Sequence, residues 1–268
     1  MTFDVDSAYP VSRAQIDSFR TNGFIKLKNV LSPETVDRYG TEVTRLTIEQ
    51  SARSEPLAER STYERAFLQV MNLWEISDRV RELVMSKRLG RIAAEILEVD
   101  GVRLYHDQSL YKEPGGGITP AHADQYYWPL SSDRTVTAWI PLQAVPQEMG
   151  PLAFFAGSQC VEFGRELSIS DESEREISAN MHAHGFRTVD EPFEVGEVSF
   201  HLGWVFHRAG ANLSNRPRSV MTIIYMDQNT RLVDPKHNYQ RENWEMWCPG
   251  AIPGQIIATS KNPLIYAA

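Results

Sequence analysis

The sequence predicts an α+β fold, with helices in the first part of the chain and an antiparallel β unit in the second. Helix-capping signals recur over about residues 1–100, whereas about 101–268 contains apolar, β-branched segments separated by Gly- and Pro-rich loops. Candidate metal ligands lie far apart in this second part, and a closed or sandwiched β unit brings such residues together at one mouth. The 268 residues are enough for one large domain or two small ones.

Serine residues at capping positions mark the expected helices of the first part. Ser12 and Gln15 have the spacing of a capping box, and Ser32 precedes a proline at the first helical position. Residues 24–30 alternate as expected for a strand with one buried face, and the class of the apolar segment 67–74 stays open. The expected helices begin after Ser12, Ser32, Ser77 and Ser86; the first ends before Gly23, the second near Gln50 and the fourth near Leu97.

Five segments of the second part are candidate strands: residues 102–112, 135–142, 151–155, 197–205 and 219–226. The acidic, serine-rich insert 161–180 is expected to be a solvated loop or short helix at the rim, with a mobile lid as the alternative. The tail 239–268, rich in Trp and Pro, is expected to pack onto the β unit, because large aromatic side chains bury much apolar area.

Composition excludes several classes of protein. A net charge of −8 without a long Lys/Arg run argues against a nucleic-acid partner. No apolar run approaches membrane-spanning length, and Met1–Asp6 lacks the apolar region of a secretory signal. Only Cys160 and Cys248 are present, so a disulfide framework is not expected. We expect a cytoplasmic monomer or homodimer that acts on a small molecule.

The segment His122-Ala-Asp124 carries the strongest chemical signal. On an extended backbone, residues i and i+2 point to the same face, so both side chains can reach one ion. His207, 85 residues after His122, follows a strand-like run and is the best third ligand. Alone, a His-x-Asp pair more often belongs to a solvated turn, and a strand-end histidine more often binds backbone. Together they match the two-histidine, one-carboxylate site of non-haem Fe(II) oxygenases.

Arg218 follows His207 by eleven residues and suits a carboxylate ligand, because its guanidinium can bind two oxygens at once. A 2-oxo acid binds iron through its keto oxygen and adjacent carboxylate, so its far carboxylate needs an anchor. Arg216 competes for this role but lies in an Asn-Arg-Pro turn and is expected to face solvent. A non-redox metalloenzyme on the same fold would not need Arg218, and an inactive binding module would be expected to lack a ligand.

Four segments together resemble the phytanoyl-CoA dioxygenase (PhyH) family: His122-Ala-Asp124, TAWIPL at 137–142, GPLAFFAGS at 150–158 and HRAGANLSNRPR at 207–218. The resemblance implies a single domain over 1–268 with a double-stranded β-helix, a cupin-like jelly roll, supported by N-terminal helices. It implies Fe(II), 2-oxoglutarate and O₂, with His122, Asp124 and His207 as iron ligands and Arg218 on the cosubstrate carboxylate. Gln108, Lys112 and, more weakly, Thr137 fit further cosubstrate contacts.

The presence of Asp124 favours hydroxylation over halogenation, since halogenating members of the family lack this carboxylate. Desaturation, cyclisation, epimerisation and endoperoxide formation remain alternatives within the family, including enzymes that make specialised metabolites. Tyr126, Tyr127 and Trp128 fit a substrate wall about as well as core packing.

Two further histidine positions are interpreted as non-ligands. His201 lies an even six residues before His207, so it can share a strand face with it, and we place it behind the ligands or in the core. His182 and His184 are expected on a surface loop.

Overall fold

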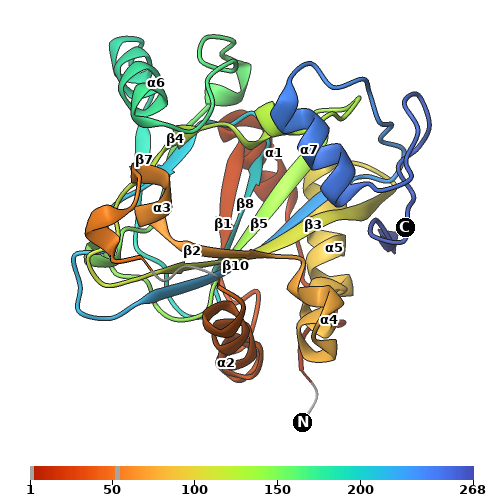
Figure 1. Ribbon diagram of the computed structural model, residues 1–268. Helices are drawn as coiled ribbons and strands as arrows, with labels where there is room; N and C mark the ends of the chain where they lie inside the picture. Colours follow the sequence, from red (N-terminus) through yellow and green to blue (C-terminus); the bar gives the residue numbers. More distant parts are fainter. Residues whose placement is uncertain (1–2, 52–54) are drawn as a thin grey trace.

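Two antiparallel β-sheets form the centre of the molecule, and helices cover their outer sides (Figure 1). The structure, a computed structural model, describes residues 3–51 and 55–268. Residues 1–2 and 52–54 lie outside the described part of the predicted domain, and the first two of them belong to the N-terminal segment 1–6 in which no secretory signal is expected. In pairing order, the large sheet contains β1 (Phe24–Leu27), β8 (Val198–Leu202), β5 (Thr135–Pro141), β10 (Arg218–Asp227), β3 (Gly101–Lys112) and β11 (Leu264–Ala267), and β2 (Leu68–Met71) also pairs with β3. The small sheet contains β4 (Thr119–His122), β9 (His207–Ala209), β6 (Leu152–Phe155) and β7 (Thr188–Asp190).

The helix starts predicted from capping serines are confirmed. The Ser12 hydroxyl accepts a hydrogen bond from the backbone N–H of Gln15, and the Gln15 side chain accepts one from the Ser12 N–H at 2.7 Å. Ser32, Ser77 and Ser86 accept the corresponding bond at the starts of α2, α4 and α5. The helices are α1 (Arg13–Asn22), α2 (Pro33–Gln50), α3 (Thr62–Ala66), α4 (Asp78–Val84), α5 (Lys87–Leu97), α6 (Asp171–Ala183) and α7 (Asn238–Trp247).

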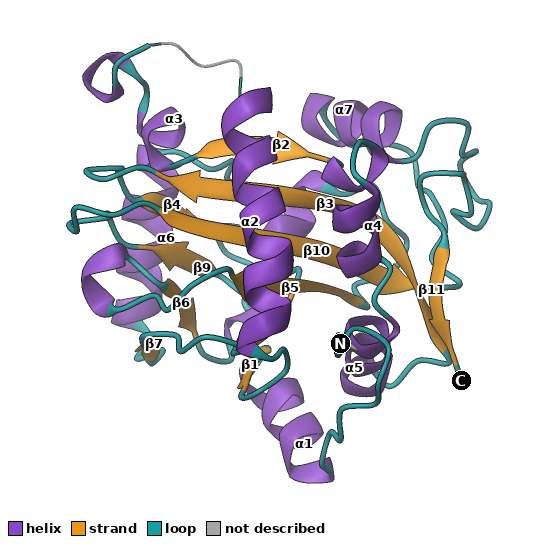
Figure 2. Cartoon of the chain, turned by 90° about the horizontal axis from the view of Figure 1, so that it is seen from below, coloured by secondary structure: helices purple, strands orange, loops and turns teal. Residues whose placement is uncertain are grey.

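Helices α1, α2, α4 and α5 cover the outer face of the large sheet, and Figure 2 shows α2 crossing β3 and β10. Alternate side chains of β10 lie on opposite faces of the large sheet. Met221, Ile223 and Tyr225 pack among the helices, whereas Thr222 and Arg218 line a cavity on the inner face. The antiparallel sheets and their helices confirm the predicted α+β jelly roll. Of the described helices, none is both long and apolar enough to span a membrane.

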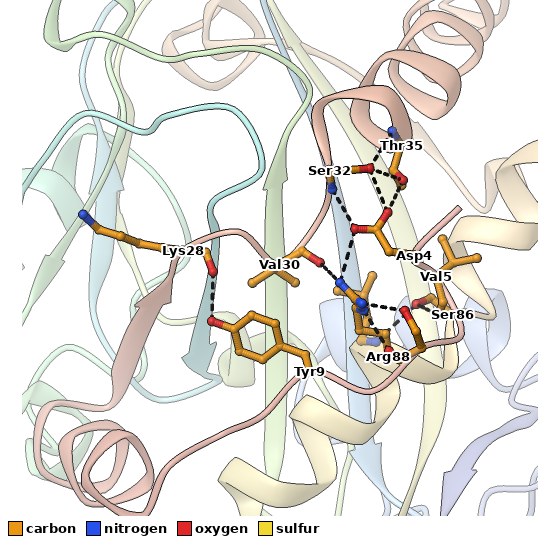
Figure 3. A network of polar contacts seen from close by, with 11 residues as sticks. Asp4, Val5, Tyr9, Lys28, Val30, Ser32, Thr35, Ser86 and Arg88 are labelled. Carbon is orange, nitrogen blue, oxygen red and sulfur yellow. Dashed lines mark hydrogen bonds and ion pairs between the residues drawn. The ribbon is translucent and has the colours of Figure 1, made fainter. Parts of the chain in front are cut away.

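The N-terminal segment is attached to two helix starts by a polar network (Figure 3). The Asp4 carboxylate accepts hydrogen bonds from the Ser32 N–H at 2.8 Å and from the Thr35 hydroxyl at the start of α2. Arg88 donates to Asp4 at 3.3 Å and to the Val30 carbonyl at 2.7 Å. Burial alone would raise the pKa of Asp4, but the hydrogen bonds from Thr35 and Ser32 lower it below its ordinary value, so the carboxylate stays ionised.

Several local expectations need correction. The predicted strand 24–30 ends at Leu27. The predicted strand 197–205 ends at Leu202, because the chain turns at Gly203 and enters the small sheet. A Cβ on Gly203 would lie 2.4 Å from the Gln125 side chain, so a larger residue here would require that side chain to move. The insert 161–180 contains the expected helix, because most of α6, which packs beside β4, lies within it. His182, expected on a surface loop, lies in the last turn of this helix.

Candidate active site

The structure brings His122, Asp124 and His207 together at the inner edge of the small sheet. His122 ends β4 and His207 begins β9, where the two residues are direct partners in the antiparallel register. Their ring centroids lie 4.2 Å apart. Asp124 begins the 3₁₀ helix η3 (Asp124–Tyr127), and one ligand atom from each of the three residues lies within 4.8 Å of the others. The predicted triad is therefore a compact donor set.

Backbone carbonyls orient both imidazoles toward Asp124. The Nδ1 atom of His122 lies 2.7 Å from the Pro120 carbonyl, and that of His207 lies 3.1 Å from the Val205 carbonyl. Each Nδ1 therefore carries the proton and donates it, which leaves the Nε2 lone pair free for a metal. The two Nε2 atoms lie 3.4 and 3.6 Å from Oδ1 of Asp124.

The charges of this site suit a divalent cation. Burial alone would raise the pKa of Asp124, but His207, His122 and His201 reverse this effect and hold the pKa well below its ordinary value. Burial and the neighbouring His122 lower the pKa of His207 well below its ordinary value. An ionised carboxylate beside a neutral imidazole is the protonation state in which these groups bind metal, and this donor set fits Fe(II).

Arg218 lies on the same cavity as the triad and is only 1% exposed. Its guanidinium donates to the Gly150 carbonyl and lies 5.6 Å from the Trp139 ring, while its Nε has no hydrogen-bond partner among the described residues. Burial lowers the pKa of Arg218 to about 10, so the group remains charged at neutral pH. No carboxylate within residues 3–51 and 55–268 forms an ion pair with it. Since an unpaired buried charge is costly, this arrangement favours an anionic ligand from outside the chain.

The cavity between the sheets has a volume of about 430 Å³ and is largely apolar. Gln108 on β3 lines it and accepts a hydrogen bond from Gln69 at 2.7 Å. One face of α7 forms another wall, and Trp247 of this helix stacks on His106 with ring centroids 4.7 Å apart. The α7 residues that line the cavity are Tyr239, Glu242, Asn243, Met246 and Trp247. Their spacing is that of one helical face.

The other predicted site residues divide between the cavity and its surroundings. Tyr127 and Trp128 line the cavity, whereas Tyr126 stacks on His237 at 4.4 Å in a neighbouring cleft. Thr137 lines the cavity, and its hydroxyl donates to Asp124 at 3.1 Å. Lys112 does not line it: its ammonium donates to the carbonyls of Gly117 and Gly210 at 2.6 and 2.7 Å. The structure thus gives Lys112 a backbone-binding position beside the predicted anion site.

Sequence reasoning missed part of the site. His201, expected behind the ligands or in the core, contacts one of them, because its Nε2 lies 3.3 Å from Oδ2 of Asp124. His106 and the α7 wall were not predicted as site residues. His106 lies two residues before Gln108, so the alternation of β3 could have identified it. Trp247 packs the tail onto the β unit, as expected, and it also lines the cavity, which was not expected.

A triad of this composition and a buried arginine on one cavity, within a jelly roll, define a non-haem Fe(II)- and 2-oxoglutarate-dependent dioxygenase. The model of the phytanoyl-CoA dioxygenase (PhyH) family matches residues 19–220, a span that includes the triad and Arg218. The chain belongs to this family, as the resemblance implied.

Similar proteins differ in the reaction that their names describe. Ectoine dioxygenase of Streptomyces coelicolor is 24% identical over 254 residues, covering 86% of this chain and 82% of that protein. Peroxisomal phytanoyl-CoA dioxygenase of Mus musculus is 21% identical over 253 residues, covering 85% and 73%. The structure of the non-heme carbocyclase SnoK from nogalamycin biosynthesis matches with a TM-score of 0.78 at 23% identity, covering 96% of this chain and 97% of that chain. At this identity the structural match shows the shared fold.

Proposed function

We propose that this dioxygenase hydroxylates a bulky, partly apolar small molecule while 2-oxoglutarate is converted to succinate and CO₂. The observation that carries the proposal is the buried, unpaired Arg218 on the cavity that also contains His122, Asp124 and His207. We further propose that residues 1–268 act as one cytoplasmic domain, as a monomer or homodimer. The described cysteines support a reducing compartment, because both are free thiols.

The side chains have separate tasks in this proposal. His122, Asp124 and His207 hold Fe(II), and Arg218 neutralises the far carboxylate of 2-oxoglutarate. Bound iron and 2-oxoglutarate supply the activation of dioxygen that oxidises the substrate. The apolar walls exclude water from the reacting groups, and Gln108 offers an amide donor to an acceptor in the cavity.

Substrate selection is assigned to the aromatic walls. Tyr127 and Trp128 follow the metal loop, and α7 faces them with Tyr239 and Trp247. Helix α7 lies beyond residue 220, where the match to the family model ends. The aromatic side chains of these walls support a bulky, partly apolar substrate. The name of the carbocyclase SnoK supports another oxidative outcome as an alternative to hydroxylation.

The direct test uses anaerobic protein loaded with Fe(II). Addition of 2-oxoglutarate should produce a visible metal-to-ligand charge-transfer band with one equivalent bound. Candidate metabolites are then screened for stimulated formation of succinate, and their products are identified by mass spectrometry. A fully iron-loaded protein that gives no band with 2-oxoglutarate would exclude the proposed cosubstrate.

A further inference from the structure

The two carboxylate oxygens of Asp124 have different surroundings. Oδ1 faces the Nε2 atoms of His122 and His207 at 3.4 and 3.6 Å. Oδ2 faces the opposite sheet, where it lies 3.1 Å from the Thr137 hydroxyl and 3.3 Å from His201 Nε2. The two sheets therefore each contact one oxygen of the same carboxylate.

Strand register explains why both contacts meet at Oδ2. Thr137 on β5 and His201 on β8 are direct partners in the antiparallel pairing of these strands. Side chains of paired residues project to the same side of a sheet, separated by about 5 Å at their Cβ atoms. Asp124 enters from the other sheet, at the first residue of η3, opposite this pair. The fold thus presents two donors side by side to one oxygen.

His201 is fixed in the orientation that this contact requires. It is 1% exposed, and its ring lies between Phe154 at 5.4 Å and His207 at 4.5 Å, measured between ring centroids. An ionised carboxylate only accepts hydrogen bonds, so His201 must carry its proton on Nε2 to bind Asp124. Its Nδ1 is buried and has no partner in the described part of the chain.

We infer that Thr137 and His201 are positioning residues that hold Oδ2 of Asp124 and leave Oδ1 as its single metal-binding atom. The inference rests on the proposed iron site but not on the identity of the substrate. Hydrogen bonds to a carboxylate are stronger than bonds between neutral groups, so the pair competes with metal for Oδ2. A carboxylate that bound through both oxygens would occupy a position needed by cosubstrate or dioxygen. Thr137 thereby acts on the metal ligand rather than on 2-oxoglutarate.

The test uses Co(II), whose visible spectrum reports the number and geometry of its ligands without turnover. Thr137→Val and His201→Leu each remove one donor and should weaken Co(II) binding about 10- to 100-fold, the usual effect of losing a group that orients a ligand. They should also change the ligand-field spectrum. Thr137→Ser and His201→Gln keep a donor at a similar position and should restore most of the affinity and spectrum.

Thr230→Val is the matched control, because Thr230 is 2% exposed and its hydroxyl has no partner in the structure. It should bind Co(II) as the wild type does. Wild-type affinity and spectrum in both Thr137→Val and His201→Leu would overturn the positioning role. If His201 were itself a metal ligand, the changed spectrum would persist in His201→Gln alone, and this result would also overturn the inference. Failure of the wild type to bind Co(II) would instead contradict the proposed metal site.

Discussion

Replacement of Arg218 by methionine tests the central electrostatic feature of the cavity. The substitution removes the charge and both forked donors but keeps an unbranched apolar stem in a buried position. Truncating one partner of a buried, hydrogen-bonded charge pair typically costs about 2–5 kcal/mol. The dissociation constant of 2-oxoglutarate should therefore rise roughly 30- to 4,000-fold, at about 1.4 kcal/mol for each factor of ten.

Arg216 provides the matched control, because it lies two residues away but is exposed. An exposed arginine contributes about 1 kcal/mol or less, so Arg216→Met should change the affinity by less than about fivefold. Both variants are titrated anaerobically with 2-oxoglutarate in the presence of Fe(II), and the charge-transfer band reports binding.

Stability separates loss of binding from loss of folding. Without cosubstrate, the wild type carries the cost of an unpaired buried cation, which Arg218→Met removes together with the hydrogen bond to Gly150. These changes oppose each other, so the urea midpoint of this variant should stay close to that of the wild type. A larger loss of affinity in Arg216→Met, or unchanged affinity in Arg218→Met, would refute the assignment of the anchor.

Further predictions concern the metal ligand, two acidic residues outside the site and the insert. Asp124→Ala should lose iron and oxygenation sharply, whereas Asp124→Asn should keep more iron; full iron content with wild-type turnover in the alanine variant would exclude Asp124 as a ligand. Burial raises the pKa of Asp107 to about 7, above its ordinary value, so its contribution to stability is complete at low pH and is lost as pH rises through 7. Asp107→Asn should remove this part of the pH dependence of the free energy of unfolding in urea. An unchanged slope of that free energy against pH would contradict the raised pKa of Asp107. Asp4→Ala should lower the free energy of unfolding by about 1–3 kcal/mol, and because its folded pKa is lowered, the difference from wild type should shrink as pH falls through that pKa. If residues 161–180 form a lid, their amide exchange should slow when iron, cosubstrate and substrate are bound, and unchanged exchange would identify an ordinary surface segment.

Features fixed by neighbours in sequence could be predicted well. The capping serines of α1, α2, α4 and α5 bind backbone N–H groups three residues away, so their pattern identifies the helix starts. The long strands β3 and β10 contain enough apolar residues to be predicted as strands without knowledge of their pairing partners. The triad and Arg218 could be proposed from the sequence, because their residue types and their order along the chain are typical of an iron and 2-oxo acid site.

Features fixed by distant parts of the chain could not be predicted. Strands β4 and β9 have four and three residues, and their extended form depends on pairing with each other. The direction of the Lys112 ammonium depends on the carbonyls of Gly117 and Gly210, the second of them 98 residues away. The turn at Gly203 also changes the relation of His201 to His207. Instead of sharing one strand face, they approach from opposite sheets.

This two-sheet construction separates the requirements for oxidation from those for substrate choice. The proposed iron ligands belong to the small sheet and to η3, which follows β4, and the residues proposed to hold Asp124 and 2-oxoglutarate belong to the large sheet. All of them lie within residues 19–220, the span of the family match. Helix α7 lies outside that span, and its Trp247 stacks on His106 of the large sheet. Because neither residue is among the iron ligands or the groups that contact Asp124, the walls of the cavity can differ between relatives while the oxidation chemistry stays the same.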